Sequence, residues 1–241
     1  MNDARLTEEK QKITDALRRH LQSAKILRQA INLQPEAARQ RLLLREWQAA
    51  RLARSYADLL ASKRYAKAAK FFLSDLYGPK DFSSRDDEVE RILPMLVAML
   101  PTSALHTVAL AVEVDALTER LDSAMVIELC AKQRINAIDE AAYAAAYRAV
   151  GREPERQRQI VLIRETGEAL AKLAKKPLLT TVLKLMRKPA HLAGLGELHA
   201  FLENGFAAFR EMGDASEFLD CIENKERQLL ENLFSGAKQA F

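Results

Sequence analysis

Acidic side chains concentrate between residues 75 and 87. Asp75, Asp81, Asp86 and Asp87 lie there, with Arg85 among them. Paired carboxylates can share a proton or hold a hard cation through their oxygens. The same residues also suit the first turn of a helix, where negative charge is favourable, and an Arg–Asp pair can fix a loop. We favour this architectural interpretation over a catalytic or cation-binding one.

The aromatic residues beside these acids make the stretch a chemical candidate as well. Asp75 follows Phe71 and Phe72, and a partly buried carboxylate would need a charged partner such as the nearby Arg85. We expect Phe72 and Leu76 to be buried and this corner to be a centre of stability. We therefore predict a candidate functional or structural corner that consists of Phe72, Asp75, Tyr77, Asp81, Arg85 and Asp86.

The four histidines do not form a strong metal signature. Neither HxxxH nor HExxH occurs, although His199 and Glu203 lie four residues apart and could share one helix face. Two ligands do not make a zinc site, and a capped or exposed histidine is the simpler interpretation. His106, after the turn at Pro101, is the one residue to inspect as a haem ligand. The sequence therefore predicts no metal and no cofactor.

Glycine-rich motifs for nucleotide binding or acyl transfer are also missing. The sequence has no GxGxxG, GxxxxGK or GxSxG pattern. Gly194 and Gly196 lie between helical patterns without a preceding strand, so they favour close helix contact or a bend. Whether the chain is an enzyme stays open, and the sequence favours a non-enzymatic role.

Basic residues crowd the N-terminal third. Residues 1–70 hold 16 Lys or Arg against 7 Asp or Glu, whereas residues 71–150 hold 7 against 13. This asymmetry indicates pairing within the chain, association between chains, or a face that binds a polyanion. A nucleic-acid interface would use Arg18, Arg28 and Arg45 among others, but aromatic residues are sparse there. Nucleic-acid binding is therefore the weaker interpretation.

Composition indicates a globular protein of helices. Of 241 residues, 49% are apolar and only eight are glycine, and alanine, leucine, arginine and glutamate abound. No apolar run approaches the ~20 residues that span a bilayer, and no secretory signal is visible at the N-terminus. Cys130 and Cys221 lack motif spacing and suit a reducing cytoplasm. We expect a cytoplasmic protein without membrane contact.

Helical periodicity runs through the whole chain. Residues 4–31 and about 35–62 each carry an apolar stripe, and the short turn between them predicts a long antiparallel hairpin. We expect an all-α bundle of about eight to ten helices. The hairpin, residues 1–62, is a candidate arm on a helical body of residues 63–241, although one continuous domain is also possible. The predicted helix boundaries are Pro35, Pro101, Pro154, Pro177 and Pro189.

One stretch carries a resemblance to a family. The string FFLSDLYGPKDFSSRD, followed by QIVLIRETG, LMRKPA and FLENGFAAFREMG, resembles a family of uncharacterised bacterial proteins over roughly residues 60 to 235. The resemblance implies a shared helical fold and no known activity.

Three functional hypotheses follow. The sequence favours a helical protein that acts through protein–protein contact, most simply a homodimer formed through the N-terminal hairpin, with another protein partner possible. The alternatives are a binder of an apolar small molecule inside the helical body and an enzyme with a scattered site. An enclosed cavity with convergent polar groups would favour the small-molecule hypothesis.

Overall fold

The computed structural model describes residues 2–73, 83–132, 137–192, 196–237 and 241. These residues form eleven α-helices and no strand, so the predicted all-α fold is confirmed. The helices are α1 (Asn2–Asn32), α2 (Pro35–Ser55), α3 (Ala57–Ala61), α4 (Ala66–Phe71), α5 (Ser83–Met99), α6 (Thr102–Ala131), α7 (Glu140–Val150), α8 (Glu153–Ala174), α9 (Pro177–Leu192), α10 (Gly196–Met212) and α11 (Ser216–Ser235).

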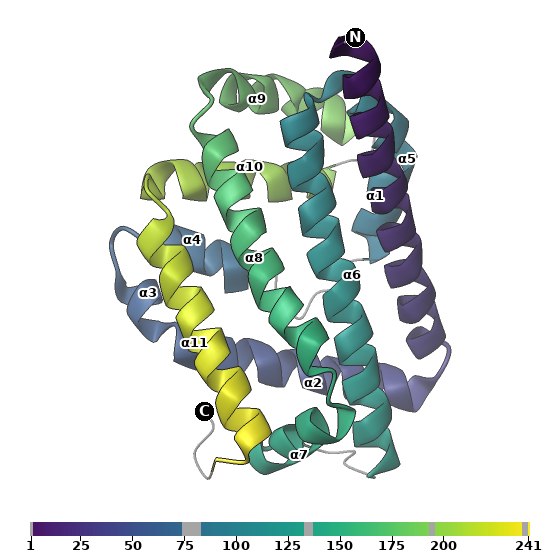
Figure 1. The fold of residues 1–241 in the computed structure, drawn as a ribbon, viewed down its shortest axis with the longest axis vertical. Coiled ribbons are helices and arrows are strands. Elements are labelled where there is room, and N and C mark those ends of the chain that lie inside the picture. The colour runs from purple at the N-terminus through teal and green to yellow at the C-terminus, as the bar shows by residue number, and fades with distance from the viewer. Residues whose placement is uncertain (1, 74–82, 133–136, 193–195, 238–240) are drawn as a thin grey trace.

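The helices form two layers (Figure 1). In the front layer α1, α6, α8 and α11 run side by side, and each packs against its neighbour. Behind them α2 and α10 cross at a steep angle, with α4 and α5 also behind the front layer. At the lower end of the view α7 closes the bundle, and α9 lies across the upper end. Because crossed layers leave space where their helices diverge, this arrangement surrounds a central region on several sides.

The first two helices do not form the predicted antiparallel hairpin. The turn between α1 and α2 is short, as expected, but α1 lies along α6 and α2 crosses behind the front layer instead of returning beside α1. The apolar stripe of α1 supplies the reason, because Leu17 and Leu21 pack with Leu93 of α5 and Leu105 of α6. A short turn fixes where the second helix starts but not its direction. The division of the chain at residue 62 stays a prediction.

Prolines mark most of the helix starts. Four of the five predicted boundaries stand within one residue of a helix start, namely Pro35, Pro101, Pro154 and Pro177. The prediction for Pro189 was wrong, because it lies in the last turn of α9 and the next helix begins at Gly196. Near a helix end, a proline removes only one backbone hydrogen bond, so the helix can continue for a few residues.

Two aromatic clusters flank the centre of the molecule. Trp47 of α2 stacks on Tyr143 of α7, with ring centres 4.0 Å apart. On the other side, Phe72 lies beside Phe209 of α10 and Phe218 of α11, at 6.3 and 5.5 Å between ring centres. No described helix combines the length and apolar character that crossing a bilayer would need. The candidate functional site lies between these two clusters.

Candidate functional site

A cavity of about 400 Å³ lies between the two layers. Side chains from all eleven described helices line it. Towards α9 and α10 its wall is apolar and is formed by residues such as Leu96, Leu100, Leu183, Phe201 and Phe206. Towards α2 and α7 the wall becomes polar and charged. The cavity therefore has an apolar end and a polar end.

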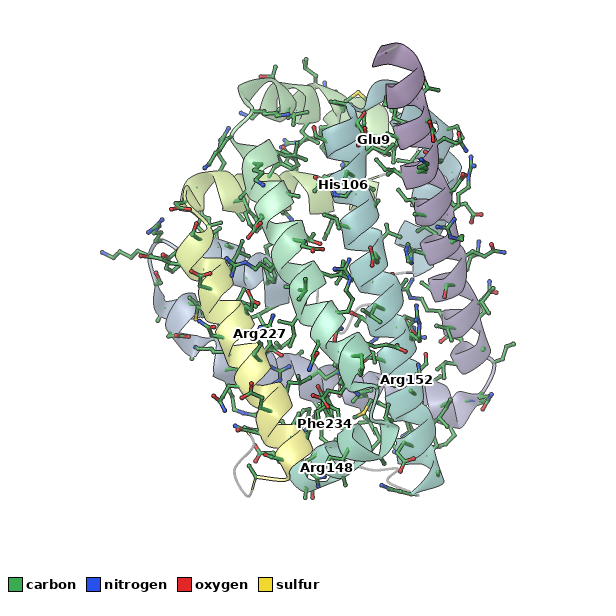
Figure 2. All side chains as sticks on the ribbon, viewed as in Figure 1. Glu9, His106, Arg148, Arg152, Arg227 and Phe234 are labelled. Carbon is green, nitrogen blue, oxygen red and sulfur yellow. The ribbon has the colours of Figure 1, made fainter. Side chains whose placement is uncertain are left out.

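The polar end of the cavity is lined by Tyr143 and Tyr147 of α7 and by Glu226 of α11. Beside it, the rings of Tyr147 and Phe234 are 5.4 Å apart, and Arg148 donates a hydrogen bond to the carbonyl oxygen of Leu233. Figure 2 labels Phe234 and Arg148 at the lower end of the bundle, whereas His106 lies far above them on α6.

A buried carboxylate organises one wall of the polar end. Glu119 of α6 is 2% exposed and accepts hydrogen bonds from three guanidinium groups. Arg28 of α1 donates through Nε at 3.0 Å, and Arg41 and Arg45 of α2 donate at 3.3 and 2.9 Å. Arg28 also donates through Nη2 to both carboxylate oxygens of Asp115, at 2.7 Å each. These pairs join the first two helices to α6.

A second ion pair joins α2 to α11. Both Nη atoms of Arg51 donate to Glu226, and the hydroxyl of Tyr56 donates to Oε1 of the same carboxylate at 2.6 Å. Burial acts to lower the pKa of Arg51, but the Glu226 carboxylate outweighs it and raises that pKa above its ordinary value. Arg51 therefore stays charged inside the protein.

Asp122 is the fourth acid of the polar end, and its carboxylate contacts the side-chain amide of Gln48. Its Oδ1 accepts a hydrogen bond from Nε2 of Gln48 at 2.9 Å. Burial raises the pKa of Asp122, although Gln48 and the positive charges of Arg45 and Arg156 oppose the shift. Burial likewise raises the pKa of Tyr143 and of Tyr147 beside it, so both phenols remain protonated at neutral pH.

Arg156 differs from the other buried arginines. It lies in the first turn of α8, is 6% exposed, and has its guanidinium carbon 3.5 Å from the centre of the Tyr147 ring. Its Nε donates to the carbonyl oxygen of Gly151 at 3.3 Å. Its Nη2 is buried and has no hydrogen-bond partner among the described residues. The cavity wall thus contains a positive group with unused donor capacity.

Comparison with protein-family models gives one match, to "Domain of unknown function (DUF8198)", over residues 27–240. The chain belongs to this family. Comparisons with curated proteins and with solved structures gave no match. The DUF8198 match agrees with the sequence resemblance to an uncharacterised family. The description of the family names no activity.

Most of the predicted corner lies outside the described part of this DUF8198 chain. Phe72 is buried and lines the cavity. Asp75, Tyr77 and Asp81 lie outside the described residues, as does Leu76. Arg85 and Asp86 belong to α5, but their side chains lie outside the described part as well. Their role as a functional or structural corner stays a prediction.

The histidines and the basic stripe take structural positions. His199 is buried, and its Nε2 lies 2.7 Å from the carbonyl oxygen of Leu183, while Glu203 pairs with Arg187. His106 is exposed, which removes the motive for a haem ligand. In the described part of the chain, no three side chains of the types that ligate metals gather. Several arginines of the predicted phosphate-binding stripe face inward, as Arg28 and Arg45 show.

Sequence reasoning missed the acids of α6, although their spacing signals them. Asp115, Glu119 and Asp122 are spaced by four and three residues, which puts them on one helix face among apolar residues. Arg41, Arg45 and Gln48 of α2 repeat the same spacing. Two matching polar stripes on otherwise apolar helices predict a buried charged contact. The partner of neither stripe is encoded locally, and Arg156 carries no comparable pattern.

Proposed function

We propose that this protein binds an apolar small molecule in its central cavity. The single observation that carries the proposal is a cavity of about 400 Å³ with a long apolar wall and a few polar groups at one end. Ligand sites in proteins span roughly 300 to 1,000 Å³ and combine apolar lining with a small number of polar groups. An apolar cavity of about 150 Å³ already accepts benzene. The space here suits a larger, elongated ligand.

The polar groups favour binding over catalysis. Glu119 and Glu226 are held by arginines, so neither is available as a general base in this arrangement. None of the four histidines lines the described wall of the cavity. Asp122 also lines the wall and accepts a hydrogen bond from Gln48, so these polar groups suit the orientation of a ligand.

Isothermal titration with straight-chain alcohols from octanol to hexadecanol tests the proposal. We expect saturable binding at one site, strongest for the chain length that fits. Ala111 of α6 lines the cavity, so Ala111→Phe should fill it and weaken binding at least tenfold. Ala131→Phe is the matched control, because Ala131 is exposed on the same helix. Absence of binding across the series, or equal binding by Ala111→Phe and the unchanged protein, would refute the proposal.

A homodimer formed through the first two helices is the second proposal. The stripe that motivated it is largely covered, because Leu17 and Leu21 pack inside the chain. What supports it now is the exposure of Ile26, Leu33 and Leu42 on the same segment. Sedimentation equilibrium should show a dimer that dissociates in the double variant Leu33→Lys and Leu42→Lys. A monomeric unchanged protein would contradict it.

A further inference from the structure

The central cavity has a positively charged group for which the chain itself supplies no counter-ion contact. Arg156 reaches the cavity wall from the first turn of α8 and is 6% exposed. Among the described residues its side chain contacts the carbonyl oxygen of Gly151 and the side chain of Tyr147, and its Nη2 has no hydrogen-bond partner. A buried cation is costly unless an anion or hydrogen-bond acceptors satisfy it. Such a group in the wall of a cavity favours an anionic ligand.

We propose that the ligand is a long-chain monocarboxylate whose carboxylate binds Arg156 and whose hydrocarbon chain fills the apolar end. This inference rests on the proposed function, since it assumes that the cavity is a binding site. It specifies the head group of the ligand, which the cavity volume alone does not. The observation behind it is the juxtaposition of a buried guanidinium, one nitrogen of which has no hydrogen-bond partner, with an apolar chamber.

The geometry of Arg156 suits a carboxylate. Its Nε donates to the carbonyl oxygen of Gly151, and the face of the guanidinium stacks on the Tyr147 ring at 3.5 Å. These two contacts hold the group in place and leave Nη2 without a hydrogen-bond partner. The interaction that this geometry offers is a charge-assisted hydrogen bond from Nη2 to one oxygen of a carboxylate. The site is preorganised, so little rotamer entropy is lost on binding.

The alternative partner inside the chain is already engaged. Asp122 and Arg156 attract each other electrostatically, yet Oδ1 of Asp122 accepts a hydrogen bond from Gln48 and burial raises the pKa of Asp122. The internal acids therefore leave the role of counter-ion to a ligand.

Competition between matched head groups tests the inference. Dodecanoate, dodecanol and dodecylamine share one chain and differ only in charge, and their affinities are measured by isothermal titration at pH 7.5. Hydrogen bonds to charged groups contribute ~1.5–3 kcal/mol, so dodecanoate should bind about 10- to 100-fold more tightly than dodecanol. Dodecylamine should bind more weakly than dodecanol. Arg156→Gln should remove the preference for dodecanoate, so that dodecanoate and dodecanol bind with similar affinity.

Two further variants separate this role from a structural one. Arg156→Lys keeps the charge and should restore part of the preference for dodecanoate. Arg158→Gln is the matched control on the same helix, because Arg158 points outward and pairs with Glu113 and Glu165. Equal affinity of the unchanged protein for dodecanoate and dodecanol would overturn the inference and leave the proposed function intact. Failure of all three ligands to bind would overturn both. A preference that survives in Arg156→Gln would also overturn it.

Discussion

Replacing Glu119 with glutamine removes the charge that holds three arginines inside the protein. Glu119→Gln keeps the shape of the side chain but neutralises the acceptor of Arg28, Arg41 and Arg45. Removing one partner of a buried ion pair typically costs ~3–5 kcal/mol, because the remaining charge is left uncompensated. Here Arg28 keeps Asp115, whereas Arg41 and Arg45 lose the carboxylate to which they donate. We therefore expect destabilisation within that range.

Thermal unfolding followed by circular dichroism measures the effect. For a chain of this size, 1 kcal/mol shifts the midpoint by ~2–4 °C, so Glu119→Gln should lower Tm by roughly 6–20 °C. Urea titration at fixed pH measures the destabilisation directly, as a decrease in the free energy of unfolding. The loss should be shared by all helices, because α1 and α2 are anchored to α6 by these pairs.

Glu113→Gln is the control for this prediction. Glu113 lies on the same helix and pairs with Arg158 near the surface, where both side chains are partly exposed. Exposed pairs contribute ~0.2–1 kcal/mol, so its midpoint should change little. Equal shifts for the two variants would refute the reasoning, because they would show that the buried carboxylate contributes no more than a surface one.

Three further predictions concern the cavity and its walls. Asp122→Asn should stabilise the protein near neutral pH: the native pKa of Asp122 lies above its ordinary value of 3.8, so ionisation of this group lowers stability as pH rises through that pKa. The gain should vanish when urea titrations are repeated below the ordinary pKa, and a gain that is constant with pH would contradict this. Phe72→Ala should cost ~3–5 kcal/mol, because Phe72 is buried between Phe209 and Phe218, and an unchanged urea midpoint would contradict its burial. Gly205→Ala should cost ~1–3 kcal/mol, because a Cβ there would stand 2.7 Å from Cζ of Phe71, and an unchanged Tm would show that the ring moves freely.

The sequence predicted the helices better than their partners. Apolar spacing and prolines locate most helix starts because both act over one or two turns of the chain. The direction of α2 depends on its contact with α6. The residues that meet in this contact are some seventy positions apart in the sequence, as the Arg45–Glu119 pair shows. Local patterns carry no information on such a distant contact. The short turn alone therefore predicted a hairpin that the structure does not contain.

The candidate site was predictable only in part. Charge asymmetry between the first and second thirds of the chain indicated internal pairing as one option, and the Arg28–Asp115 pair is an instance of it. The cavity itself follows from how the layers cross, which no single segment specifies. Arg156 could not be singled out, because a lone arginine in the first turn of a helix has the same local sequence whether it faces solvent or a cavity.

The three arginines held by Glu119 also set an order of events during synthesis. Arg28 is made 91 residues before its partner, and Arg41 is made 78 residues before it. At a translation rate of ~5–20 residues per second, Arg28 therefore waits roughly 5–20 s for its counter-charge to be made. During that interval the arginines of α1 and α2 have no Glu119 to pair with. These two helices therefore emerge from the ribosome before they can pack against α6. A nascent chain arrested before residue 119 should be digested rapidly by protease in these two helices, and one arrested beyond the end of α8 should resist.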